Sequence, residues 1–342
     1  MLTFSVLDQS PVRQGVSPRD ALMETIELAC HVEALGYRRY WLAEHHGSPG
    51  LAGSAPEILI ARVAAETTHI RVGSGGVMLS HYSSLKVAEQ FRLLETLYPG
   101  RIDLGIGRAP GSDQLTAAAL QHGPGALGIE HFPSQIADLL GFLEHTIPAD
   151  HPFSRIKLTP DGETLPEIWI LGSSEQSAIF AAYFGRAFSF AQFITDEGGP
   201  AIMESYRRQF RPSPRLAMPE ASIGVFVICA DDQAEARRLA ASRDLSRLRQ
   251  RQGIPAPFPP PEDALTYPYN DAERRLVEYH RRRQIVGDPG QVKAQLTSLA
   301  DSYGVEEIVV LTITHDFEAR KRSYSLLAEA FGLKAIEGGA SA

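Results

Sequence analysis

The regular alternation of short apolar segments with longer amphipathic ones constrains the fold most strongly. Residues 18–35 show the helical pattern, with apolar side chains every three or four positions and Gly36 where a helix would end. Parallel strands need crossover connections, and both faces of a parallel sheet must be covered. The pattern predicts an α/β fold, a closed (β/α)8 TIM barrel with loop insertions at its carboxyl-terminal face; an open doubly wound sheet is the alternative. The expected strands are residues 4–7, 39–43, 70–77, 101–106, 168–171, 187–193, 223–230 and 307–312.

No shift in composition marks a linker, so residues 1–342 are expected to form a single domain. One stretch interrupts the alternation of strand-like and helix-like segments. Residues 253–270 are rich in proline, which removes backbone donors and argues against a regular helix. We interpret this stretch as a surface excursion, with a lid or a dimer contact as the alternative. Residues 113–128 are rich in glycine and alanine and show no motif.

Charge and hydropathy argue against two classes of partner. The formal net charge is -8, and Lys and Arg are spread along the chain apart from the run 281–283, whereas a nucleic-acid surface needs concentrated positive charge. No apolar run is long enough to span a bilayer, and the first residues do not resemble a secretion signal. We therefore expect a cytoplasmic protein that binds neither nucleic acid nor membranes.

Polar side chains and glycines gather where several of the expected strands end. In a parallel barrel the carboxyl ends of the strands meet at one face, where active sites lie. This rule brings together Asp8, Ser10, His45, Gly75, Gly76, Tyr82, Arg108, Leu171, Gly172, Ser173, Ser174 and Ser177. Of these, we interpret Asp8, Ser10 and Tyr82 as candidates for a substrate pocket.

The segment after the fifth expected strand has the chemistry of an anion site. Gly172 permits a close backbone approach, and Ser173 and Ser174 stand where a helix begins, at the positive end of its dipole. Ser177 adds a hydroxyl one turn later, and Arg108 would supply a fork-shaped counter-charge for a phosphate. An ordinary serine cap and a structural ion pair of Arg108 are the alternatives.

Glycines and histidines near the second and third strands raise two further questions. Glycine inside a strand marks a bulge or a close approach to the backbone, so Gly75 and Gly76 suggest a flat ring over the strand end, or else a bend. His45 and His46 are adjacent, and successive side chains point to opposite sides of a strand. The pair is therefore a poor metal clamp, and no metal site is expected.

Four motifs taken together resemble the bacterial luciferase-like flavin-dependent monooxygenases, and the single-chain, non-luminescent members most closely. They are AEHH, RVGSGGVMLSH, LYPGRIDLGIGRAPG and ILGSSEQS, and the likeness continues through VGDPGQVKAQL and GVEEIVVL near the C-terminus. The resemblance implies that His45 is the acid/base residue beside the flavin and the substrate. It implies a non-proline cis peptide at Gly75-Gly76 against the flavin ring. The cofactor-binding residues that it implies are Gly75, Gly76, Arg108, Leu171, Gly172, Ser173, Ser174 and Ser177, of which Arg108, Ser174 and Ser177 would meet the flavin phosphate.

The function that this resemblance implies is a two-component FMN-dependent monooxygenase. A separate NAD(P)H:flavin reductase would supply FMNH2 by diffusion, O2 would be the co-substrate, and the organic substrate would be a small aldehyde, ketone or sulfur compound. The lack of a GxGxxG motif at a strand-helix junction agrees with a separate reductase. A homodimer through the second and third expected helices is implied as well.

Two departures from the family pattern qualify these expectations. A second phosphate arginine of luciferase is missing from the neighbourhood of residues 131–134, and Gly107 stands in place of its reactive cysteine, which argues against a light-emitting subunit. Three alternative functions stay open: a deazaflavin (F420)-dependent hydride-transfer oxidoreductase of the same fold, a non-catalytic flavin-binding protein, and a metal-dependent hydrolase that uses His45 and His46.

Overall fold

A computed structural model describes residues 2–108, 113–121 and 128–335. Its strands form one parallel sheet that closes on itself, because β1 pairs with both β2 and β9, and β7 pairs with both β6 and β9. This confirms the predicted (β/α)8 TIM barrel. The strands are β1 (Thr3–Asp8), β2 (Arg39–Leu42), β3 (Arg71–Met78), β4 (Ile102–Gly107), β5 (Glu167–Gly172), β6 (Ala187–Ala191), β7 (Ala221–Cys229), β8 (Gln284–Gly287) and β9 (Glu307–Leu311).

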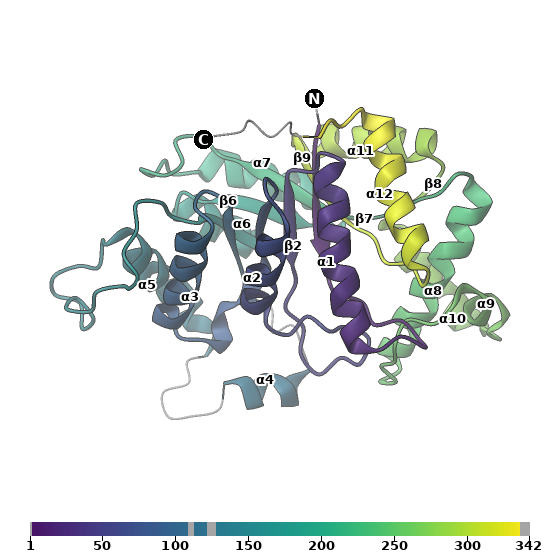
Figure 1. Cartoon of the computed structure of the whole chain (residues 1–342), viewed down its shortest axis with the longest axis horizontal. Helices are drawn as coiled ribbons and strands as arrows, with labels where there is room; N and C mark the ends of the chain where they lie inside the picture. Colours follow the sequence, from purple (N-terminus) through teal and green to yellow (C-terminus); the bar gives the residue numbers. More distant parts are fainter. Residues whose placement is uncertain (1, 109–112, 122–127, 336–342) are drawn as a thin grey trace.

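Helices alternate with the strands and surround the barrel (Figure 1). They are α1 (Pro18–Ala34), α2 (Pro56–Glu66), α3 (Ser84–Leu97), α4 (Gln114–Leu120), α5 (Phe132–Glu144), α6 (Glu175–Tyr183), α7 (Gly199–Gln209), α8 (Gln233–Arg251), α9 (Pro261–Thr266), α10 (Asp271–Arg281), α11 (Pro289–Tyr303) and α12 (Phe317–Phe331), with short 3-10 turns η1 (Leu79–His81) and η2 (Ile129–His131). Within the described ranges, no helix combines the length and the apolar character needed to cross a bilayer. The region 113–128 contains α4, and its residues 122–127 lie outside the described ranges.

Strand β8 is absent from the expected strands, none of which contains residues 284–287. The structure ends α10 at Arg281 and then pairs the four residues of β8 with 226–229 of β7. The first half of β7 pairs with β6, so β8 continues the barrel wall beyond the end of β6. Four residues are too few for hydrophobic periodicity to distinguish a strand from a helix end.

The proline-rich segment 253–270 contains helix α9, so the prediction that it lacks regular helix is wrong. Prolines occupy the start of α9, where a missing N-H group breaks no helical hydrogen bond. The backbone N-H of Phe258 donates to Val12 O at 2.9 Å, and Gln14 N donates to Phe258 O at 2.8 Å. The segment is therefore bonded to the loop that follows β1.

The amino-terminal end of the barrel is held by a buried ion cluster around Arg39. Its guanidinium nitrogens lie 2.8 Å from Asp103 Oδ2, 2.7 Å from Glu167 Oε2 and 3.1 Å from Glu307 Oε1. Burial lowers the pKa of Arg39, but the three carboxylates outweigh burial and raise this pKa above its usual range. The cluster joins β2, β4, β5 and β9 at the face opposite the expected active site, where a barrel gains stability rather than chemistry.

Candidate functional site

The carboxyl ends of the strands face the lower edge of the molecule in Figure 1, where α4 and several loops gather. His45 follows β2, Gly75 and Gly76 lie in β3, Arg108 follows β4, and Gly172 ends β5. These four strands are consecutive neighbours in the sheet. The structure thus brings the predicted catalytic and cofactor-binding residues to adjacent positions on one rim of the barrel.

Glu44, just after β2, organises the residues around it. Its side chain is 1% exposed and accepts three hydrogen bonds: from Tyr82 Oη at 2.7 Å, from His46 Nε2 at 2.7 Å and from the backbone N-H of Met78 at 2.9 Å. A buried carboxylate needs such partners, because an unpaired charge is costly inside a protein. Glu44 therefore positions the second histidine and the tyrosine hydroxyl and fixes the loop against β3.

His45 is the histidine left available for chemistry. Its backbone N-H donates to Gly53 O at 2.8 Å, while its Nδ1 is buried and has no hydrogen-bond partner among the described residues. Burial, and to a smaller extent the neighbouring His46, lowers the pKa of His45 to about 4. The ring is therefore neutral at pH 7 and can accept a proton. No cluster of three or more metal-ligating side chains occurs in the part of the chain that the structure describes.

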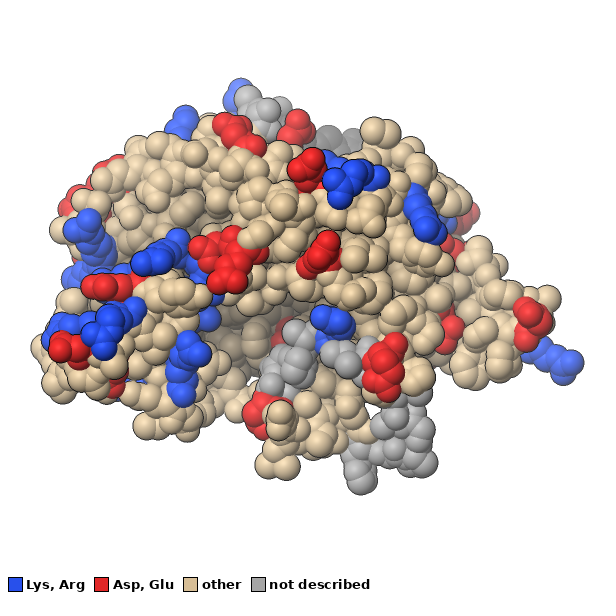
Figure 2. Space-filling model, turned by 180° about the vertical axis from the view of Figure 1, so that it is seen from behind, with Lys and Arg blue, Asp and Glu red and all other residues tan. Residues whose placement is uncertain are grey.

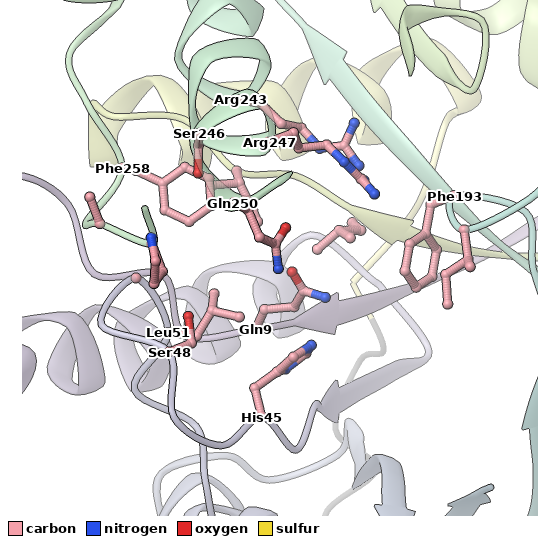
Figure 3. Close-up of a pocket in the computed structure, with 16 residues that line it drawn as sticks. Gln9, His45, Ser48, Leu51, Phe193, Arg243, Ser246, Arg247, Gln250 and Phe258 are labelled. Carbon is pink, nitrogen blue, oxygen red and sulfur yellow. The ribbon is translucent and has the colours of Figure 1, made fainter. Parts of the chain in front are cut away.

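His45 lines a cavity of about 230 Å³ at the carboxyl face. Figure 3 shows His45 and Gln9 on the strand side of this cavity, and Arg243 and Arg247 reaching toward it from α8 on the opposite side. The proline-rich segment contributes Phe258 to the wall. That segment thus forms part of the cavity wall, and its role as a lid or a dimer contact stays a prediction. The other lining residues are Ser48, Gly50, Leu51, Phe193, Ile194, Ser246, Gln250, Pro255, Ala256, Leu311 and Ile313.

Asp8 and Ser10, expected in a substrate pocket, do not line this cavity. The buried Asp8 carboxylate lies 2.8 Å from the Arg320 guanidinium and also accepts from the Tyr40 hydroxyl. The Ser10 hydroxyl accepts from Thr25 Oγ1 at 3.0 Å. Both side chains are engaged by their own structural neighbours. Tyr82, the third candidate, does not line the cavity either, since its hydroxyl is bound to Glu44.

The peptide bond between Gly75 and Gly76 is cis, as the resemblance implied. The pairing of β3 with β4 shifts register at this point. A Cβ atom on Gly76 would lie 2.7 Å from Gly105 O and 2.8 Å from Leu171 Cδ1, and one on Gly75 would meet Leu7. Packing between strands therefore requires these glycines whether or not a ring lies over them, and Leu171 belongs to that packing.

The start of α6 leaves backbone donors available. Ser174 is the N-cap residue, but its side chain makes no capping hydrogen bond; its Oγ lies 3.3 Å from Ser177 Oγ instead. A Cβ atom on Gly172 would overlap the Ser177 side chain, so glycine there lets the two serines approach the strand end. The free N-H groups of a helix start, with two hydroxyls beside them, can bind an anion.

Arg108 is the cation available for such an anion. It follows β4, which pairs with β5 through Ile106 and Ile170, so it emerges beside the strand that leads to α6. Its half-buried side chain forms no ion pair or hydrogen bond with other residues of the described ranges. The uncapped helix start, the serine pair and this uncommitted guanidinium fit a phosphate group such as that of FMN.

The sequence analysis missed the residues of the opposite wall. Arg243 and Arg247 lie one turn apart on α8, and a basic helix face is usually solvated, so the sequence alone predicts no site there. Figure 2 shows basic side chains gathered toward the lower left, the side of α8 and α10, beside a hollow at the lower edge. The only sequence signal was the helical spacing of the two arginines.

Comparisons with known proteins agree with this geometry. Residues 2–306 match the family described as luciferase-like monooxygenase. The chain is 39% identical to an Escherichia coli protein named luciferase-like monooxygenase, covering 95% of this chain and 96% of that protein. It is 37% identical to N-acetyl-S-alkylcysteine monooxygenase of Bacillus subtilis, covering 96% of this chain and 98% of that protein.

Solved structures agree as well. The apo form of MsnO8 superposes with a TM-score of 0.90 at 42% identity, covering 98% of this chain and 99% of that one. The oxygenating constituent of 3,6-diketocamphane monooxygenase from Pseudomonas putida, in complex with FMN, has a TM-score of 0.69 at 18% identity and covers 96% of this chain and 97% of that one. An F420-dependent secondary alcohol dehydrogenase has a TM-score of 0.70 at 12% identity and covers 98% and 99%. The last two likenesses establish the fold alone.

Proposed function

The chain belongs to the luciferase-like monooxygenase family of enzymes, and from this premise we propose that it is the oxygenase of a two-component system. It would use FMNH2 and O2 to oxygenate a small organic substrate, and a separate NAD(P)H:flavin reductase would supply the FMNH2 by diffusion. When bound, reduced flavin supplies two electrons and activates O2. Binding, orientation, exclusion of water and proton transfer are left to the protein.

The observation that carries the proposal is a set of uncommitted polar groups on one rim of the barrel. Ser174 and Ser177 stand at an uncapped helix start, and Arg108 emerges from the neighbouring strand. These groups would hold the flavin phosphate. His45 lies two strands away from Arg108 at the same end of the barrel, and its Nδ1 has no hydrogen-bond partner within the described ranges.

His45 would move a proton during oxygen transfer. A neutral imidazole with an unpartnered nitrogen can accept a proton from the reacting groups and return it later. Glu44 would act as a positioning residue, because it binds His46 and Tyr82 and so fixes the loop that carries His45. The cavity beside His45 is smaller than the roughly 300–1,000 Å³ of drug-sized sites. It would therefore take a small substrate and exclude bulk water.

A sulfur compound is the substrate class that we favour among the three implied by the resemblance. The B. subtilis relative named N-acetyl-S-alkylcysteine monooxygenase covers almost the whole chain. Its name describes a thioether as substrate, and the cavity beside His45 is lined by apolar side chains such as Leu51 and Phe258 that suit an alkyl group.

Isotope transfer from 18O2 tests the proposal. Purified protein is mixed with FMNH2, 18O2 and N-acetyl-S-ethylcysteine, and the product is examined by mass spectrometry. We expect one 18O atom per product molecule. A parallel reaction with reduced F420 and a secondary alcohol tests the hydride-transfer alternative; turnover there, with no 18O incorporation in the first reaction, would replace the oxygenase assignment. FMN binding with no substrate-dependent O2 consumption would favour a non-catalytic flavin-binding protein.

We also propose that the chain forms a homodimer through α2 and α3. Ile58 on α2 is 68% exposed, and Leu97 on α3 is 58% exposed, whereas Ile60 and Ala64 on α2 are buried against the barrel. Exposed apolar side chains on two neighbouring helices form a surface that a second copy can cover. Sedimentation velocity tests this: the wild type should sediment as a dimer and Ile58→Glu as a monomer.

A further inference from the structure

Two guanidinium groups, those of Arg243 and Arg247, face the His45 cavity without an ion-pair partner among the described residues; the charge of Asp244 acts on Arg243 but does not outweigh its burial. Arg243 is 5% exposed, and its guanidinium carbon lies 3.6 Å from the centre of the Phe226 ring. Neither Arg243 nor Arg247 forms an ion pair or a hydrogen bond with any residue that the structure describes. The nearest acid in sequence, Asp244, binds Arg281 instead, with Oδ2 2.8 Å from the guanidinium.

Burial lowers the pKa of Arg247, and two further cations, Arg283 and Arg251, lie close enough to lower this pKa further. Arg247, Arg283, Arg251 and Arg243 all act on His280, whose pKa is lowered to about 4 by burial and by these charges. His280 Nδ1 lies 2.6 Å from the Arg283 guanidinium and is therefore a neutral acceptor rather than another cation. Burial also depresses the pKa of Arg243, with Arg247 adding to the effect. A buried cation without a partner is costly, and an anion in the cavity would remove that cost.

We propose that Arg243 and Arg247 bind the carboxylate of a small organic acid, which, given the oxygenase function proposed above, is the substrate. Two planar guanidinium forks match the two oxygens of a carboxylate. The rest of the ligand would then extend across the cavity toward His45, which lies on the opposite side (Figure 3). The arginines thus select the acid and orient its reacting atom.

The position of the cavity separates this anion from the flavin phosphate. The serine pair follows β5 and neither serine lines the cavity, whose walls come from residues after β1, β2 and β6, from the end of β9 and the residues after it, from helix α8 and from the proline-rich segment. Two anion sites on different parts of the rim fit a phosphate-bearing cofactor and an acidic substrate that bind together. A single anionic ligand would leave one of these two anion sites without a negative charge.

Equilibrium binding without flavin tests the inference. N-acetyl-S-ethylcysteine and its methyl ester are titrated into the protein by calorimetry, since the two ligands differ in the carboxylate alone. We expect the wild type to bind the acid at least tenfold more tightly than the ester, and Arg247→Gln to abolish this preference while leaving ester affinity unchanged. Arg249→Gln is the matched control, because it removes the same charge from α8 at a position that does not line the cavity.

Arg243→Lys provides a second variant, which keeps the buried positive charge but loses the planar guanidinium group with its paired N-H donors. We expect it to fold, as judged by an unchanged circular dichroism spectrum and FMN affinity, and to bind the acid about tenfold more weakly. Equal affinity of the wild type for acid and ester would overturn the inference, and so would an equal loss in Arg249→Gln. A loss of FMN affinity in Arg247→Gln would assign the arginines to the flavin phosphate and overturn it too.

The outcomes separate this inference from the proposed function. Acid-selective binding that depends on Arg247, without 18O transfer, would contradict the oxygenase proposal and support the carboxylate site. Equal oxygenation of acid and ester would contradict the carboxylate site and support the oxygenase.

Discussion

His46 Nε2 lies 2.7 Å from Glu44 Oε1, so the second of two adjacent histidines is turned toward a buried carboxylate while the first is not. His45 instead lines the cavity and keeps Nδ1 unpartnered among the described residues. The two rings therefore serve different purposes: His46 belongs to the hydrogen-bond network that holds the loop, and His45 is free to act on a ligand.

Replacement of His45 by alanine should separate chemistry from cofactor binding. The residue is proposed to transfer a proton, a role that contributes roughly 100-fold or more to rate. We expect His45→Ala to reduce product formation by about that factor and to leave FMN affinity within about twofold, as judged by fluorescence titration. His69→Ala is the control, because His69 is exposed and precedes β3, at the amino-terminal end of the barrel away from the site. Wild-type turnover in His45→Ala would remove the residue from the mechanism.

The lowered pKa of His45 predicts a specific dependence of stability on pH. In the unfolded chain a histidine titrates near its ordinary value of about 6.5, whereas burial lowers the folded pKa of His45 to about 4. Between these two pKa values the unfolded state binds more protons than the folded state. The contribution of His45 to the free energy of unfolding is therefore fully present above the pKa of the unfolded chain, and it is lost as the pH falls through the pKa of the folded protein. This loss should reach up to about 3 kcal/mol.

Urea denaturation at pH 7 and at pH 4.5 measures this dependence. The free energy of unfolding should fall less steeply in His45→Ala than in the wild type over that interval. His280, whose pKa is also lowered to about 4, contributes with the same sign and keeps part of the slope in the variant. Identical slopes in the two proteins would show that His45 is not a buried neutral group.

Loss of the Arg39 cation should strongly destabilise the barrel. Arg39→Met would remove the fully buried cation that Asp103 and Glu307 share. As ion-pair partners among the residues that the structure describes, Asp103 would keep only the partly exposed Arg71, and Glu307 only Arg38 at 3.7 Å. Breaking a buried pair in this way costs roughly 3–5 kcal/mol, and the remaining partners place the expected loss toward the lower end. Arg62→Met, which breaks an exposed pair with Glu66 on α2, should cost less than about 0.5 kcal/mol. Urea denaturation midpoints compare the two. An equally small loss of unfolding free energy in both variants would mean that water solvates the carboxylates around Arg39.

A methyl group at Gly172 should disturb the phosphate site selectively. Gly172→Ala would place a Cβ on the Ser177 side chain and push that hydroxyl away from the helix start. We expect FMN affinity to fall by about tenfold, which is the loss of about one good hydrogen bond to a charged group. At Gly107 a Cβ would meet no described residue other than Met78, at the ordinary contact distance of 3.6 Å, so Gly107→Ala should bind FMN normally. Similar affinities in both variants would argue against Ser177 as a phosphate ligand.

The barrel and the position of its rim could be predicted because both follow from periodicity. The expected strands 39–43, 187–193 and 307–312 begin at the first residues of β2, β6 and β9, and the other strand boundaries differ by one or two residues. Wherever a strand ends, parallel topology brings that end to a common face. Short or proline-rich elements were missed, as with β8 and α9, because hydrophobic period carries little information over four to six residues.

Side-chain roles were harder to predict because they depend on partners distant in sequence. Asp8 looked like a pocket residue until the structure placed Arg320 against it. Arg243 and Arg247 looked like a solvated helix face until the fold turned them toward His45 (Figure 3). In each case the deciding contact joins residues from opposite parts of the chain, and no local pattern encodes such a contact.

The affinity of the protein for reduced FMN relative to reduced riboflavin, measured anaerobically, tests the central claim most directly. The two ligands differ by the phosphate, which the account places at the start of α6 beside Arg108. We predict that FMN binds at least about tenfold more tightly, or about 1.4 kcal/mol, and that Arg108→Gln lowers FMN affinity severalfold while riboflavin affinity is unchanged. Equal affinity of the wild type for both flavins, or a preference for FMN that is undiminished in Arg108→Gln, would contradict this placement of the phosphate.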